Sequence, residues 1–134
     1  MKHKTLLLIL GLAICLAGHG QTQATTETPQ RMIKVTILYP NGEGKTFDMD
    51  YYATKHMPML ADLFGDTLKN LEIDKGISGR TADDPIPYLA IGYLYFDSIE
   101  DYQNAFGPHA AQIRGDIPNY TNILPVVQIS EVVR

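Results

Sequence analysis

The sequence predicts an α+β domain whose elements follow the order strand, helix, strand, strand, helix, strand. Three observations support this prediction. Apolar residues alternate at 33–39, helical stripes follow at 48–65 and 98–115, and residues 88–96 are apolar or aromatic at nearly every position. The chain has 134 residues, of which 45% are hydrophobic. This is enough apolar material for one compact domain and excludes a second one.

The N-terminus differs in composition from the rest of the chain. Lys2, His3 and Lys4 precede an almost uninterrupted apolar stretch at residues 5–18. This stretch is too short for a comfortable permanent membrane helix, so residues 1–20 are expected to be a signal peptide. We therefore predict a periplasmic or secreted protein with no stable membrane span after signal cleavage.

Cleavage is expected after Gly20 or Ala24, where small residues stand at the positions that a signal peptidase reads. Residues 21–30 are rich in Thr and Gln and predict a flexible linker, which leaves 31–134 as the domain. Two alternatives remain open for the leader: lipidation at Cys15, and an uncleaved anchor helix.

Charge and cysteine usage exclude several classes of function. The chain has 11 Lys and Arg against 15 Asp and Glu, a formal net charge of −4. A basic surface for nucleic acid is therefore absent. The single cysteine, Cys15, lies in the expected leader, so the mature domain would have no disulfide, no thiolate nucleophile and no cysteine metal site.

The first half of the domain begins with the strand at 33–39, which a Pro-Asn-Gly turn ends. Asp48 can cap the helix that follows, and Gly65 can end it. Tyr52, His56, Leu60 and Leu63 recur every three or four residues and would therefore lie on one face of this helix. Pro58 predicts a kink, or two short helices of which Pro58 opens the second.

The second half begins with a half-exposed strand at 68–76 and continues with 88–96, which is expected to be buried on both faces. Ser98, with Asp101 three residues later, resembles a capping box for the next helix. A short helical turn from His109 is expected to end at Gly115, and a loop leads to a last strand at 126–133.

The two halves have similar boundaries, because a Phe-Asp pair opens each helical region and a Gly-Asp pair closes it. This symmetry favours a ferredoxin-like βαββαβ domain with both helices on one face of an antiparallel sheet. The other face of strand 88–96 would then expose apolar side chains to water. We therefore expect a homodimer that covers this face.

His56 is the most interesting titratable residue, because it shares a helix face with Tyr52 just before Pro58. An imidazole there can transfer protons near neutral pH. The alternative is an interior histidine that only packs on Tyr52.

His109 stands at the start of its helical turn, where the helix dipole favours a neutral ring. The two histidines could flank one pocket above the sheet.

Other motifs are weaker. Gly44-Lys45-Thr46 resembles the end of a phosphate-binding loop, but Tyr39 stands where the first glycine is required, so a plain turn is expected. No glycine-rich dinucleotide fingerprint follows a strand, and the histidines lack metal-ligand spacing. The sequence therefore predicts neither a cofactor nor a metal.

Several longer segments together resemble one known family, EthD, which is named for a protein of ethyl tert-butyl ether degradation. The matching segments are Phe47-Asp48-Met49-Asp50-Tyr51-Tyr52, Lys55-His56-Met57-Pro58, Phe106-Gly107-Pro108-His109 and Asp116-Ile117-Pro118-Asn119-Tyr120-Thr121-Asn122. The resemblance covers about residues 33–133. It implies the dimeric α+β barrel fold, in which a pocket between sheet and helices would hold an apolar carbonyl compound.

The same resemblance implies a catalytic role for His56 through the motif Tyr-Tyr-x-x-x-His-x-Pro. Members of the family are often labelled reductases, an oxidoreductase class, although no residue here would bind a nicotinamide. Superfamily relatives include isomerases, cyclases and cofactor-free monooxygenases.

We therefore expect a protein that binds a small hydrophobic carbonyl or aromatic compound and acts on it as a cofactor-free enzyme of the proton-transfer, isomerase, cyclase or oxidoreductase type. The expected catalytic residues are His56 and Tyr52, and the expected substrate-binding residues are His109, Asn119, Tyr120 and Tyr51. Two rivals remain: a non-catalytic carrier that uses the same pocket, and a structural dimer without a ligand. The sequence names neither the substrate nor the reaction.

Overall fold

The structure, a computed structural model, describes residues 31–134. The expected signal peptide with its cleavage site, Cys15 and the linker at 21–30 lie outside these residues. Within the described part of the chain, no helix is long and apolar enough to cross a membrane.

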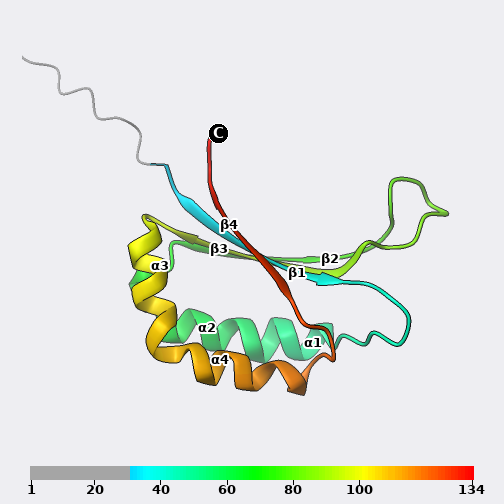
Figure 1. Cartoon of the computed structure of the whole chain (residues 1–134), viewed down its shortest axis with the longest axis horizontal. Coiled ribbons are helices and arrows are strands. Elements are labelled where there is room, and N and C mark those ends of the chain that lie inside the picture. Colours follow the sequence, from blue (N-terminus) through cyan, green and yellow to red (C-terminus); the bar gives the residue numbers. More distant parts are fainter. Residues whose placement is uncertain (1–30) are drawn as a thin grey trace, which may run out of the picture.

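A four-stranded sheet has its helices packed on one face (Figure 1). Its strands are β1 (Ile33–Pro40), β2 (Asn70–Lys75), β3 (Tyr88–Phe96) and β4 (Val126–Glu131). The order across the sheet is β2-β3-β1-β4, and every neighbouring pair is antiparallel. This confirms the predicted ferredoxin-like βαββαβ arrangement.

The first helical region is continuous. It comprises α1 (Met49–Tyr51), a π-helix (Tyr52–His56) and α2 (Met57–Phe64). The side chain of Asp48 accepts a hydrogen bond from Tyr51 N, and Gly65 ends the region with a φ of 53°.

The π-helix lies just before Pro58. Pro58 occupies the first turn of α2, as predicted, and Met57 N–H bonds to the carbonyl of Tyr52, five residues back. The wider turn changes the hydrogen-bond register where a proline would otherwise break an α-helix. The helix therefore continues through the expected break.

The second helical region comprises α3 (Ile99–Phe106), a 3₁₀ turn (Gly107–His109), α4 (Ala110–Asp116) and a second 3₁₀ turn (Ile117–Asn119). Ser98 caps α3 by accepting from Asp101 N. The expected end at Gly115 is wrong. Only Gly44 and Gly65 have positive φ in the described chain, so α4 passes through Gly115 to Asp116.

The core lies between the sheet and the helices, and β3 faces it with Ala90, Gly92, Leu94 and Phe96. The alternate β3 residues Leu89, Ile91, Tyr93 and Tyr95 are half-buried on the helix-free face. Burial of β3 on both faces is therefore wrong for the single chain, because no second layer covers that side.

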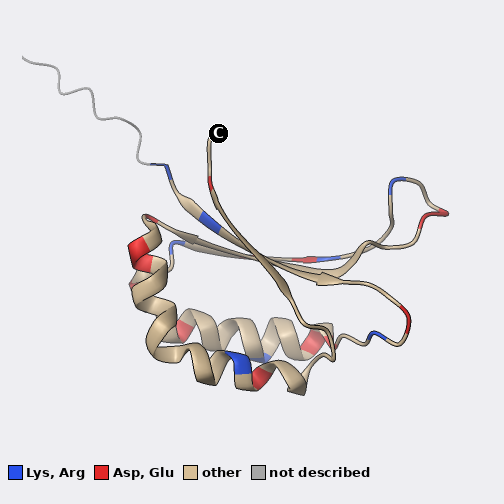
Figure 2. Cartoon of the chain, viewed as in Figure 1, with Lys and Arg blue, Asp and Glu red and all other residues tan. Residues whose placement is uncertain are grey.

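Charged groups interrupt the helix-free face. Lys34 lies 5.6 Å from the centre of the Tyr93 ring, and the Tyr95 hydroxyl donates to Glu72. Figure 2 shows acidic and basic residues scattered over the strands, helices and connectors of the described chain, without a concentration of basic ones. The face is therefore an aromatic strip flanked by polar residues.

Candidate functional site

A cavity of about 220 Å³ lies between the sheet and the helices. Its walls come from β1, β3, β4 and the two helical regions: Val35, Ile37, Tyr39, His56, Leu60, Phe64, Leu94, Tyr102, Phe106, Ile113, Arg114, Ile117, Pro125 and Val127. This wall is almost entirely apolar, with His56 and Arg114 as its basic side chains. Such a lining is typical of a site for a small organic molecule.

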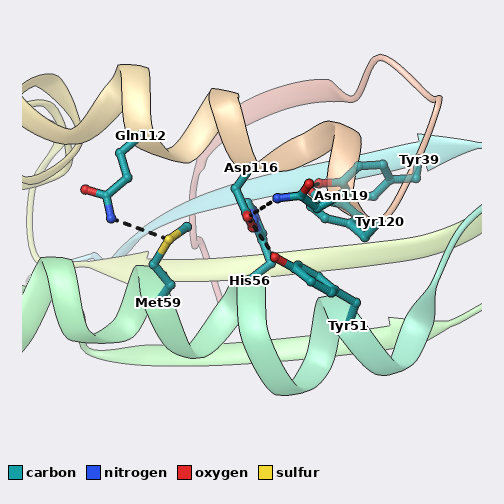
Figure 3. Close-up of polar contacts among 8 residues, drawn as sticks. All are labelled: Tyr39, Tyr51, His56, Met59, Gln112, Asp116, Asn119 and Tyr120. Carbon is teal, nitrogen blue, oxygen red and sulfur yellow. Dashed lines mark hydrogen bonds and ion pairs between the residues drawn. The ribbon is translucent and has the colours of Figure 1, made fainter.

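His56, the last residue of the π-helix, is 3% exposed. Its ring is stacked on that of Tyr52, with centres 5.6 Å apart and planes 17° apart, and lies 4.6 Å from the Tyr120 ring. Its Nδ1 lies 2.8 Å from Asp116 Oδ2 (Figure 3). Among residues 31–134, its other ring nitrogen, Nε2, has no hydrogen-bond partner. One nitrogen is therefore fixed and the other is available to a ligand.

Asp116, at the end of α4, joins three side chains of this site. Besides His56 Nδ1, it accepts hydrogen bonds from the Tyr51 hydroxyl at 2.9 Å and from Asn119 Nδ2 at 2.8 Å (Figure 3). Asp116 was not among the site residues predicted from the sequence. The available signal was the spacing Asp116-x-x-Asn119, which places an acceptor and a donor one turn apart.

The His56–Asp116 pair has a preferred protonation state. Burial lowers the pKa of His56 below its ordinary 6.5, although the hydrogen bond and charge of Asp116 oppose this shift. Burial alone would raise the pKa of Asp116, but hydrogen bonds from His56, Asn119 and Tyr51 bring it below its ordinary value. A carboxylate only accepts hydrogen bonds, so the proton of neutral His56 lies on Nδ1. Nε2 then holds a free lone pair.

Three tyrosines surround this pair. The hydroxyls of Tyr39 and Tyr120 lie 2.7 Å apart and share a hydrogen bond, and Tyr39 also lines the cavity. Tyr52 is fully buried, does not line the cavity, and its hydroxyl has no hydrogen-bond partner among the described residues. Burial raises the pKa of all three phenols, so they remain protonated donors. The geometry makes Tyr52 a support for His56 rather than a group that reaches a ligand.

The other expected substrate-binding residues have different positions. Tyr51 and Asn119 bond to Asp116 and do not line the cavity, while Tyr120 packs against His56. His109 is half-buried in the 3₁₀ turn before α4 and does not line the cavity. The structure therefore brings Tyr51, Tyr52, Asn119 and Tyr120 around His56, but it does not bring His109 there.

The segment that resembled a phosphate-binding loop is a plain turn. The Gly44-Lys45-Thr46 segment forms a turn in which Lys45 N–H bonds to the Gly42 carbonyl at 3.2 Å. Across residues 31–134, no three His, Cys, Asp or Glu side chains gather in a way that could hold a metal ion.

The fold and cavity define an α+β protein of the ferredoxin-like type with a largely apolar interior cavity. A family model for the EthD domain matches residues 41–123, and this chain belongs to the EthD family. No curated protein matches the chain.

Solved structures agree with this assignment. An EthD-like protein from Ralstonia eutropha JMP134 is 43% identical, with a TM-score of 0.75, covering 78% of this chain and 95% of that one. An EthD family protein from Bacillus halodurans C-125 is 18% identical, with a TM-score of 0.53, covering 76% and 99%. A putative monooxygenase from Shewanella loihica PV-4 is 12% identical, with a TM-score of 0.50, covering 77% and 95%. The last two show the fold alone.

Proposed function

We propose that this EthD family protein binds a small apolar carbonyl or aromatic compound in its cavity and catalyses proton transfer on it without a cofactor. One observation supports this most strongly. His56 lines an apolar cavity, its Nδ1 is held 2.8 Å from Asp116, and its Nε2 has no partner among residues 31–134. This is the arrangement of a general base oriented by a carboxylate.

In the proposed reaction, His56 Nε2 takes a proton from a carbon next to the ligand carbonyl. The electron pair of the broken C–H bond moves into the carbonyl group and forms an enolate oxygen. Asp116 stabilises the imidazolium that results, and His56 then returns the proton to the same carbon or to a conjugated one. Tyr39 lines the cavity and can donate its hydroxyl to the enolate oxygen while it accepts from Tyr120.

We further propose that the protein is exported and acts as a homodimer. The leader at residues 1–20 supports export. The half-buried aromatic strip of β3 on the helix-free face supports dimerisation, because a second sheet would remove these side chains from water.

The test uses phenylacetone in heavy water, where exchange of its benzylic protons is followed by proton NMR. The native protein is expected to accelerate exchange about 100-fold or more over buffer, the usual scale of general base catalysis. His56→Asn should reduce exchange to the buffer rate while ligand line broadening persists. The matched control His109→Asn should exchange like the native protein, because His109 does not line the cavity.

Two results would contradict the enzyme proposal. If the native protein binds phenylacetone but exchange stays at the buffer rate, the protein is a carrier. If His56→Asn exchanges as fast as the native protein, another group is the base.

A further inference from the structure

The cavity has a deep end and a mouth that differ in chemistry. Of its lining residues, Val35, Tyr39, His56, Leu60, Phe64, Leu94 and Ile113 are buried, whereas only Arg114 and Val127 are exposed. The charged guanidinium group therefore lies on the solvent side. The neutral imidazole lies on the buried side.

Arg114 is held at this mouth by an aromatic ring. Its guanidinium carbon lies 5.4 Å from the centre of the Phe106 ring, and Phe106 lines the same cavity. A cation over an aromatic face is attracted by the ring and makes no N–H hydrogen bond to a side chain there. This contact therefore holds the charge at the mouth and leaves the hydrogen-bond donors of Arg114 unused.

No acidic side chain of the described chain neutralises Arg114. The ion pairs in residues 31–134 are Arg31–Glu131, His56–Asp116 and Lys69–Asp97. Asp116 lies only two residues away, but its two oxygens accept from His56, Tyr51 and Asn119. The guanidinium N–H groups of Arg114 thus remain available to bind an anionic group of a ligand.

The deep end is unsuited to a permanent carboxylate. Its polar groups are the neutral imidazole of His56 and the hydroxyl of Tyr39. These can accept or donate one hydrogen bond, but neither supplies the positive charge that a buried carboxylate needs. An anionic group on a ligand would therefore stay at the mouth, with the apolar part of the ligand inside.

We propose that the cavity selects an apolar or aromatic compound bearing one carboxylate, which Arg114 binds at the mouth while the reacting carbon faces His56 Nε2. This inference rests on the proposed function for the reaction, and it adds the charge and the orientation of the substrate. Arg114 becomes the residue that determines specificity.

The test compares two probes of nearly equal shape, phenylacetate and phenylacetamide, by calorimetric titration of the full domain. The native protein is expected to bind phenylacetate at least about tenfold more tightly, as for a hydrogen bond to a charged group. Arg114→Gln should bring the two affinities to near parity, and Arg114→Lys should keep part of the preference. The native preference should also shrink as salt is raised.

The matched control is Arg80→Gln, which removes the same charge from the exposed connector between β2 and β3, away from the cavity lining. It should bind both probes like the native protein. Equal native affinities, a preference that persists in Arg114→Gln, or a preference lost in Arg80→Gln would each overturn the inference. So would the failure of both probes to bind.

The two proposals fail in different ways. A native protein that prefers phenylacetate, and that binds phenylacetone without exchanging its protons, supports the substrate class and refutes the catalysis. His56→Asn should keep the carboxylate preference while losing exchange, because Arg114 and not His56 binds the charge.

Discussion

Tyr52 and His56 are stacked, but they do not contribute in the same way. His56 reaches the cavity, whereas Tyr52 is fully buried behind it with an unpartnered hydroxyl. A buried hydroxyl without a hydrogen bond costs about 1–3 kcal/mol of stability. On this account the Tyr52 ring supports His56, and the Tyr52 hydroxyl lowers stability.

Tyr52→Phe tests this division directly. Because the ring remains and the unpaired hydroxyl is lost, the free energy of unfolding should rise by about 1 kcal/mol, measured by urea denaturation. Proton exchange on phenylacetone should stay at the native rate. If Tyr52→Phe loses proton exchange, the Tyr52 hydroxyl takes part in catalysis, as predicted from the sequence.

Individual site residues were predictable only where the signal is local. The helix-face spacing of Tyr52 and His56 placed them together correctly. Asp116 lies 60 residues further on and meets His56 only through the packing of α4 against α2. His109 was expected to flank the same pocket as His56, but His56 lies in a π-helix and His109 in a 3₁₀ turn. His56 and His109 therefore face different parts of the molecule, although their positions in the two halves of the sequence are similar.

The π-helix and β3 fit together at a glycine. A Cβ built on Gly92 would lie 2.3 Å from the Tyr52 hydroxyl and 3.1 Å from the Met57 methyl group. Both neighbours are fully buried, so they have little space into which they can move. Gly92 is thus required for the close approach of the helix that places His56.

Gly92→Ala should lower the free energy of unfolding by about 1–3 kcal/mol, the scale of overpacking in a core. The matched control is Gly115→Ala in α4, where an added Cβ meets nothing within 4 Å. That change should raise stability by about 0.5–1 kcal/mol, because alanine is the better helix former. Both are measured by urea denaturation, and a neutral Gly92→Ala would show that Tyr52 is not tightly packed there.

Elements were predictable from the sequence wherever periodicity or a cap marks them. The alternation at β1, the serine cap of α3 and the position of Pro58 all matched. The π-helix could not be predicted, because Tyr52 and His56 keep the spacing of four residues that an ordinary helix also gives. The end of α4 was misplaced because Gly115 does not take the positive φ that would stop the helix, so α4 continues to Asp116.

At the scale of the whole molecule, the helix-free face of the sheet remains open. Ile91 lies at its centre, paired with Leu38 on one side and Asp74 on the other. The flanking polar residues resemble the rim of an interface around an apolar and aromatic middle. The sequence predicted the aromatic strip of β3. It did not predict which polar residues flank this strip, because that depends on the register between neighbouring strands.

We expect the domain to sediment as a dimer at micromolar concentration and Ile91→Asp to shift it towards the monomer. A carboxylate at the centre of the face would be buried without a partner in the dimer. The control is Ile77→Asp, because Ile77 is 88% exposed on the connector after β2. A native monomer, or an Ile91→Asp variant that stays dimeric, would contradict this interface.

The central claim is that His56 is neutral, holds its proton on Nδ1 against Asp116 and offers Nε2 to the cavity. Imidazole ¹⁵N NMR across a pH titration tests it most directly. We predict an Nδ1–H tautomer at neutral pH and a titration midpoint below 6.5, because burial lowers the pKa. The midpoint should fall further in Asp116→Asn, because the carboxylate that opposes this shift is gone. A proton on Nε2 at neutral pH, or a midpoint above 6.5, would contradict the account.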